Sequence, residues 1–209
     1  KRPIIRQLEV EPRAVCPGQT ASIKWNIEPA PGVNRITNVR INAFLQTIYD
    51  GSEAKWQKEF SVPYNTAAPS SQKIEVKITS SDGKSTTEYV QLSIVPLDMV
   101  KRSLSLARED KPASASTSSV LKFKVLNSSG IKLNNVKARI VISKDPHLQG
   151  ATVVAELASV SISPGINTLQ FNLGASSKPL GSETYLTLFY GNTVPMKELA
   201  SFPLSLESK

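Results

Sequence analysis

Cysteine and histidine are almost absent from the sequence, which has one of each, Cys16 and His147. A single thiol excludes a disulfide framework and a zinc site made of several cysteines, and a single imidazole excludes a metal site made of several histidines. Apolar runs are also shorter than the roughly 20 residues that a membrane-spanning helix needs. The sequence therefore predicts no cofactor, no metal cluster and no membrane insertion.

Sequence signatures of catalysis are missing too. The chain has no G-x-S-x-G elbow, no H-E-x-x-H helix and no phosphate-binding loop. His147 follows an Asp-Pro pair, and we interpret it as an exposed loop residue, because a catalytic histidine also needs a nucleophile and an orienting acid beside it. Cys16 has no base in its half of the chain, and Asp50 and Glu53 supply only part of the oxygen ligands of a calcium site, which the sequence leaves open. We therefore expect a protein that is not an enzyme.

Alternation of apolar and polar residues with period two is the dominant pattern. In the segment 20–28, TASIKWNIE, four apolar residues including Trp25 point to one face, and a helix would scatter them around its circumference. In 39–45 the alternation places on one face Val39, Ile41, Ala43 and Leu45. The same period recurs in 74–78, 90–94, 121–125, 136–142, 169–173 and 186–190. Each run predicts a strand with one buried and one solvated face.

Turn residues separate these runs. Pro-Gly pairs begin at positions 17, 31 and 164, and Asp82-Gly83 between two alternating runs predicts a β-hairpin. We place a domain boundary at 95–98, VPLD, because about 100 residues on each side suit one β-sandwich each. The serine-rich segment 111–119 is interpreted as a loop between the first two strands of the second half, with a flexible interdomain linker as the alternative.

The segment 17–25, PGQTASIKW, resembles the second strand of many immunoglobulin-like and fibronectin-like domains, in which a Pro-Gly turn precedes an alternating strand that ends in a core tryptophan. Cys16 stands alone and before this strand, so the disulfide pair of antibody domains is missing, which favours cysteine-poor bacterial relatives. The expected fold class is all-β, with two tandem immunoglobulin-like or fibronectin-III-like antiparallel β-sandwich domains at 1–97 and 98–209. Trp25 is expected in the core of the first.

The second half resembles the bacterial cell-adhesion-related domains called CARDB. Those domains have a strand, an Asn/Gly turn, a second strand, and then a Pro-Gly turn before an alternating strand. The matching segments here are 121–125, 127–130 (NSSG), 136–142, 163–165 (SPG) and 168–173. The resemblance implies a binding or spacer role in a surface or exported protein, and it transfers no catalytic residue.

Basic residues outnumber acidic ones by 25 to 17, for a formal net charge of +8, which divides into +3 for 1–97 and +5 for 98–209. Outward positions on two successive strands of the second half carry Lys122, Lys124, Lys137 and Arg139. They form one patch if the two strands pair as a hairpin, and they are split over two faces if the strands cross between sheets. Nucleic-acid binders usually add stacking aromatic residues, and here only Tyr185 and Phe189 are placed to serve. We expect weak, salt-sensitive attraction to polyanions and no nucleic-acid partner.

These features favour a non-enzymatic binding or structural segment of an exported bacterial protein or surface assembly. Loops and sheet edges, the loop 145–147 included, would contact another protein or a cell-surface glycan. The best contact candidates are Tyr49, Trp56 and Tyr64, in a stretch that we interpret as irregular, between the third strand and Ile74. Each is alternatively a side chain that covers the edge of the core. If they are exposed and coplanar, the chain is instead an accessory carbohydrate-binding module of a larger secreted enzyme.

Two further features concern the setting of the chain. It begins at Lys1 without a methionine or a signal segment, which suggests a piece of a longer protein. Asn127-Ser128-Ser129 matches a glycosylation sequon, but a three-residue match by itself is weak. We predict an extracellular, cell-surface or periplasmic location, and the sequence leaves the partner and the oligomeric state open.

Overall fold

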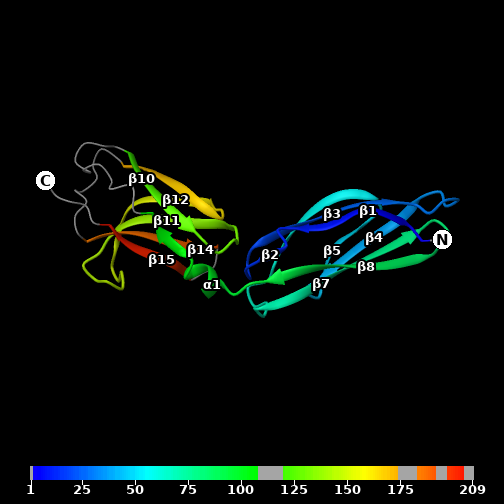
Figure 1. The fold of residues 1–209 in the computed structure, drawn as a ribbon, viewed down its shortest axis with the longest axis horizontal. Helices are drawn as coiled ribbons and strands as arrows, with labels where there is room; N and C mark the ends of the chain where they lie inside the picture. The colour runs from blue at the N-terminus through cyan, green and yellow to red at the C-terminus, as the bar shows by residue number, and fades with distance from the viewer. Residues whose placement is uncertain (1, 108–119, 174–182, 192–196, 205–209) are drawn as a thin grey trace. The chain divides into compact units, whose positions relative to one another are not determined.

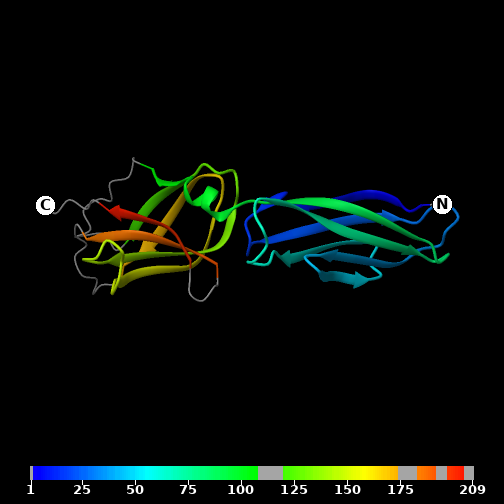
Figure 2. The same cartoon turned by 90° about the horizontal axis from the view of Figure 1, so that it is seen from below.

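The computed structural model in Figure 1 describes residues 2–107, 120–173, 183–191 and 197–204 of the 209-residue chain. The chain divides into two compact units, Lys1–Leu97 and Asp98–Lys209. Strands dominate both, and Figure 2 shows the strands of each unit in two layers. The predicted all-β fold class is confirmed: each unit is a β-sandwich of two sheets whose strand pairs are mainly antiparallel. The serine-rich segment 111–119 lies outside the described residues.

The first unit has eight strands in its described part. They are β1 (Ile4–Glu11), β2 (Ala14–Val15), β3 (Thr20–Glu28), β4 (Ile36–Ala43), β5 (Gln46–Gly51), β6 (Lys55–Ser61), β7 (Ser70–Ser80) and β8 (Ser85–Ile94). One sheet has the order β1-β3-β6 and the other the order β2-β8-β7-β4-β5. The N-terminal segment serves both sheets, because β1 pairs antiparallel with β3 and β2 then pairs parallel with β8.

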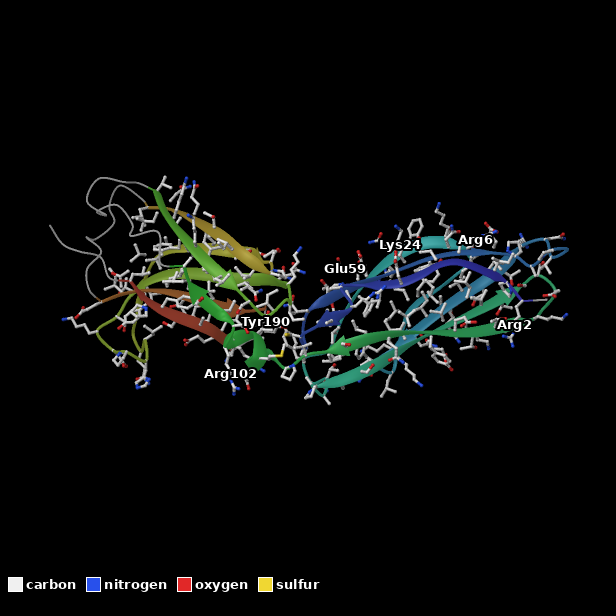
Figure 3. All side chains as sticks on the ribbon, in the orientation of Figure 1. Arg2, Arg6, Lys24, Glu59, Arg102 and Tyr190 are labelled. Carbon is white, nitrogen blue, oxygen red and sulfur yellow. The ribbon has the colours of Figure 1, made fainter. Side chains whose placement is uncertain are left out.

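The two sheets enclose the residues that the alternation placed on one face. Ile23 and Trp25 of β3 and Ile74 of β7 are all 0% exposed. The alternate positions point to solvent, as Lys24 does in Figure 3. Removing the apolar side chains from water is the main favourable contribution to such a core. The predicted burial of Trp25 is therefore confirmed.

Of two hairpin turns in this unit, one agrees with the sequence-based prediction and the other contradicts it. The predicted hairpin at Asp82-Gly83 is confirmed, since β7 pairs with β8 and Gly83 has a φ of 78°. The placement of Leu45 on the buried face is wrong. β4 ends at Ala43, and Phe44 and Leu45 form the two-residue turn to β5, with φ values of 52° and 59°. The chain reverses before the alternation ends, and Leu45 is fully exposed as a result.

The stretch interpreted as irregular contains two strands, and that interpretation is wrong. Tyr49 belongs to β5 and Trp56 to β6, while Tyr64 lies in the turn that follows. Both strands lie at sheet edges. An edge strand tolerates polar side chains on its inward face, as β6 does with Lys58, and the apolar alternation is lost there.

The second unit begins with the short helix α1 (Leu97–Lys101), whose first residue is the last of the first unit, and it has seven strands in its described part. They are β9 (Leu104–Leu106), β10 (Val120–Asn127), β11 (Leu133–Ile142), β12 (Thr152–Ile162), β13 (Gly165–Asn172), β14 (Thr184–Tyr190) and β15 (Lys197–Leu204). One sheet has the order β13-β10-β9 and the other the order β12-β11-β14-β15. Phe171 and Tyr190, the latter labelled in Figure 3, are each 1% exposed in the core between them.

Two asparagine side chains tie the turns of the second unit to its strands. Asn127 is 1% exposed, and its Nδ2 donates hydrogen bonds of 2.8 and 3.4 Å to the carbonyls of Ile131 and Ile162. Asn167 spans the β12–β13 turn, donating 2.8 Å to the Ser163 carbonyl and accepting 2.8 Å from the Ser163 N–H. The asparagine of the sequon is thus a buried structural residue in the folded chain.

Candidate binding surfaces

Two tryptophans are partners across the strand pair β3–β6. Trp25 and Trp56 lie opposite each other in the antiparallel register, which places both side chains on the same face of the sheet. β3 is the central strand, and Trp25 is 0% exposed, whereas β6 is an edge strand and Trp56 is 52% exposed. One face of one strand pair therefore carries a core tryptophan and a surface tryptophan.

Tyr49 of β5 packs against Trp25. The two ring centroids are 4.9 Å apart at an interplanar angle of 51°. The Nε1 of Trp25 donates a 2.7 Å hydrogen bond to the carbonyl of Glu53, and the Glu53 N–H donates one of 3.2 Å to the Tyr49 hydroxyl. Gly51 makes room for this hydroxyl, since a Cβ there would lie 2.5 Å from it. The geometry of Tyr49 matches the alternative of a side chain that covers the edge of the core.

Tyr64 lies in the turn after β6 and is 44% exposed. Its ring packs on the Pro17-Gly18 turn, because a Cβ on Gly18 would lie 2.2 Å from a ring carbon. Gly18 also has a φ of +86°, a conformation that glycine adopts without strain. Part of the Tyr64 ring is therefore occupied by the backbone of its own domain.

The three aromatic candidates do not form one flat platform. Trp56 and Ser61 are five residues apart on β6, which is about 16 Å along an extended strand, and Tyr64 lies beyond Ser61. Tyr49 packs against Trp25, the partner of Trp56. The structure thus brings Tyr49 and Trp56 to one end of β6 and places Tyr64 at the other.

The sequence-based prediction did not identify two of the exposed large side chains, Tyr89 and Leu45. Tyr89 is 57% exposed on the outward face of β8, with the Lys73 ammonium 5.8 Å from its ring centroid. Its position directly before Val90, out of phase with the buried run, is a signal that identifies it. Leu45 carries no such signal, because a Phe-Leu turn lacks the Asn-Gly or Asp-Gly signature of two-residue hairpins.

The four basic residues that the sequence placed on outward positions of two successive strands are divided between the two sheets of the second unit. Lys122 and Lys124 belong to β10 in the three-stranded sheet, and Lys137 and Arg139 to β11 in the four-stranded sheet. The alternative in which the four charges are split over two faces is the one that the structure adopts. No single cationic patch is formed by these four residues.

Glu156 of β12 binds both basic side chains of β11. Its carboxylate lies 2.5 Å from Nε of Arg139 and 3.6 Å from Nζ of Lys137. The hydrogen bond from Arg139, with the positive charges of both neighbours, holds the pKa of Glu156 below its ordinary value. The Arg139 guanidinium also lies 5.3 Å from the Phe189 ring centroid. This cluster neutralises part of the local charge and occupies a ring that a nucleic-acid base would need for stacking.

Cys16 and His147 are the residues considered above as a nucleophile and a general base, and both occupy structural positions. Cys16 is 0% exposed, and burial raises the pKa of its thiol to about 11, so that it stays protonated at neutral pH. His147 is exposed, and its backbone N–H donates 2.8 Å to the Asp145 carboxylate in a tight turn. Within the described ranges, no three His, Cys, Asp or Glu side chains are grouped closely enough to hold a metal ion.

Asp50, one half of the carboxylate pair considered for calcium, is engaged by donors on the neighbouring strand. Its oxygens accept 2.7 Å from Nδ2 of Asn38 and lie 2.9 Å from the guanidinium of Arg40. The Asn38 hydrogen bond, with the charge of Arg40, lowers the pKa of Asp50. The carboxylate is held on the sheet face by β4.

The sequence matches no protein-family model and no curated protein. Among solved structures it is similar to a DUF4785 family protein from Legionella pneumophila, at 13% identity and a TM-score of 0.35; the match covers 96% of this chain and 57% of that one. It is also similar to fibronectin(III)-like modules of Clostridium thermocellum CbhA, at 12% identity and a TM-score of 0.35, over 100% of this chain and 98% of the other.

A third similar structure comes from work on carbohydrate-binding modules of the β-sandwich superfamily, at 10% identity and a TM-score of 0.36, over 86% of this chain and 87% of the other. At these values the three likenesses assign neither a family nor a ligand to this chain.

The part of the chain that the structure describes includes no helix with the length and apolarity that crossing a membrane requires.

Proposed function

We propose that the chain is a non-catalytic binding segment of an exported or cell-surface protein, and that it contacts a protein partner through Trp56. The observation that carries the proposal is the exposure of Trp56, 52%, beside a core that Trp25 already fills. A large ring left half in water gains free energy when a partner covers its apolar area. Tryptophan is also among the residue types most enriched at binding hot spots.

The neighbours of Trp56 on β6 support this assignment. Lys55, Gln57 and Lys58 are all exposed and polar, so an aromatic centre is bordered by a polar rim, the usual anatomy of a contact region. Lys58 points to the same face as Trp56, because the two are two residues apart on a strand. A charge at that position opposes the pairing of another strand with β6. The proposed contact is therefore made by side chains.

A protein partner is favoured over a glycan by the arrangement of the aromatic residues. Tyr49 is packed against Trp25, and Tyr64 lies at the other end of β6, so Trp56 offers a single ring. The proposal includes an extracellular, cell-surface or periplasmic setting and the kinship of the second unit with cell-adhesion-related domains, both of which rest on the sequence pattern.

The experiment isolates the partner from envelope and secreted proteins of the source organism on the immobilised wild-type chain, and then measures binding by calorimetry. Trp56→Ala is expected to weaken binding at least about tenfold, the loss typical of a hot-spot residue, with an unchanged melting temperature. Tyr89→Ala is the matched control, because Tyr89 is similarly exposed, 57%, on the other sheet. It is expected to leave the affinity unchanged.

Three other outcomes are distinguishable. Equal affinities of the wild type and Trp56→Ala would contradict the proposal and place the contact elsewhere. A lower melting temperature of Trp56→Ala together with weaker binding would assign Trp56 to the core. A polysaccharide ligand that depends on Trp56 would replace the protein partner with the carbohydrate-binding alternative.

A further inference from the structure

Among the residues that the structure describes, β13 is the terminal strand of the sheet β13-β10-β9. It pairs with β10 over eight consecutive positions, from Val120↔Asn172 to Asn127↔Gly165, with no shift of register. An edge strand of this regularity presents a row of N–H and C=O groups that a further strand can satisfy. We propose that this edge is a self-association site, at which β13 of one molecule pairs antiparallel with β13 of a second copy.

The other edge strands that the structure describes each carry a feature that opposes such pairing. β2 has two residues and β9 has three. The pairings of β1, β5, β12 and β15 with their neighbours contain register shifts, and β15 also holds Pro203. β6 is regular but carries Lys58 on its inward face. Bulges, proline, charge and short length are the devices by which proteins protect sheet edges.

The sequence of β13, GINTLQFN, contains no charged residue and no proline. Its inward side chains Leu169 and Phe171 are buried in the core, which fixes the strand in place. Its outward side chains Ile166, Thr168 and Gln170 are exposed. Uncharged, β-branched and amide side chains suit cross-strand contacts, and an uncharged strand meets no repulsion from its own copy.

Symmetry selects the register of the proposed pair. A two-fold axis through Thr168 places this residue opposite its own copy and Ile166 opposite Gln170, all on the outward face. Paired threonines are among the favourable cross-strand contacts. The axis also keeps the inward face of each copy directed toward its own core, because the side-chain period along the strand is two.

The lysines on the neighbouring strand β10 do not prevent a second copy from pairing with β13. Lys124 of β10 is the register partner of Thr168, so in the dimer it lies three strand spacings from its symmetry mate, about 14 Å. That distance exceeds the screening length of about 8 Å at physiological ionic strength. A dimer of this kind is stable to added salt, whereas a complex with an acidic partner held by Lys122 and Lys124 dissociates.

Sedimentation equilibrium of the full chain tests the proposal. One strand pair is a small interface, so we expect a monomer–dimer equilibrium between about 10 μM and about 1 mM, unchanged or strengthened in 0.5 M salt. The variant T168K/Q170K is expected to stay monomeric over the whole range. Ser105→Lys is the matched control, because Ser105 is an exposed residue on β9, the opposite edge of the same sheet, and it is expected to dimerise as the wild type does.

A second measurement keeps the proposal falsifiable if the double variant folds poorly. Thr168→Cys is expected to give a disulfide-linked dimer on mild oxidation with oxidised glutathione, since opposite residues of an antiparallel pair have the Cα spacing of a disulfide. Cys16 is buried and does not compete. Ser105→Cys is expected to give none. A monomeric wild type at all concentrations, loss of the dimer in Ser105→Lys, or equal cross-linking of both cysteine variants would overturn the proposal.

Discussion

In the first sandwich an indole holds the loop at the end of the core, whereas in the second sandwich carboxamides hold the loops. Trp25 is buried in full and reaches the Glu53 carbonyl with its one N–H. Asn127 is almost equally buried, but it donates to two carbonyls and accepts from the N–H of Ser129 at 3.1 Å. The backbone groups of the loops thus find hydrogen-bond partners in two ways. In the first sandwich the partner is the single N–H of a large apolar ring, and in the second it is a small side chain with several polar atoms.

The two sandwiches also differ at their edges. The longer edge strands of the first carry a register shift or an inward lysine, and its exposed aromatic residue Trp56 stands among polar neighbours. The second has in β13 a regular, uncharged edge. We infer a division in which the first sandwich offers side chains to a partner and the second offers backbone groups to a copy of itself.

The largest effect is expected for Trp25→Ala, which removes the ring at the centre of the first core. Lost burial and the remaining cavity lower the unfolding free energy of that sandwich by about 3–5 kcal/mol. Denaturant unfolding followed by circular dichroism measures it. The second sandwich has its own core and should keep its transition midpoint. If the unfolding transition of the first sandwich does not change in Trp25→Ala, the indole does not hold this core together.

Asn127→Ala is expected to lower the unfolding free energy of the second sandwich by about 1–3 kcal/mol, because the carbonyls of Ile131 and Ile162 lose the hydrogen bonds that the carboxamide donates. The same unfolding experiment measures it. Asn172→Ala, an exposed asparagine in the same unit, is the control and should stay within about 0.5 kcal/mol of the wild type. If the two variants unfold alike, carboxamides do not hold the loops of this sandwich.

A smaller effect of opposite sign is expected at the β4–β5 turn of the first sandwich. Leu45 adopts a φ of 59° while fully exposed, whereas the second sandwich has Asn135 at a φ of 55°. Asparagine tolerates this conformation better than leucine does, so Leu45→Asn should raise the unfolding free energy by about 0.5–1 kcal/mol. Gln46→Asn, at the neighbouring exposed position, should give no gain. A destabilised Leu45→Asn variant would show that the leucine makes contacts in the fold.

The smallest effect is expected for Glu156→Gln and depends on pH. The folded-state pKa of Glu156 is lowered, so its carboxylate stabilises the fold above its unfolded pKa of about 4.3, and this contribution is lost as the pH falls through the folded pKa. Because the side chains of Arg139 and Glu156 are 24% and 33% exposed, the difference from the wild type at pH 7 should be at most about 1 kcal/mol. Thermal unfolding at pH 7 and pH 3 measures it, and a difference that grows toward pH 3 would contradict the sign.

Central strands were predictable because their pattern is local. In β3, and in β7 from Ile74 onward, every second side chain is buried, so the period of two is visible in the sequence itself. β6 was not predictable, because Lys58 occupies its inward face at the sheet edge. The turn at Leu45 was missed for another reason, since two bulky residues with positive φ carry no turn signature.

The surfaces depend on contacts between segments that are distant in sequence. The separation of Lys122 from Arg139 follows from the sheet to which each strand belongs, and the sequence left both alternatives open. Tyr49 and Trp56 looked equivalent as aromatic residues in one stretch. Both lie on edge strands, and their difference arises because the ring of Tyr49 packs against Trp25, whereas Trp56 is 52% exposed.

Trp25 and Trp56 are register partners, yet we assign one to the fold and the other to binding. Fluorine NMR of the full chain labelled with 5-fluorotryptophan addresses both at once, because it gives one resonance for each indole, and Trp56→Phe assigns them. Only the Trp56 resonance is expected to respond to exchange of H₂O for D₂O and to addition of the isolated partner. A partner-induced shift of the Trp25 resonance with the Trp56 resonance unmoved would contradict the assignment.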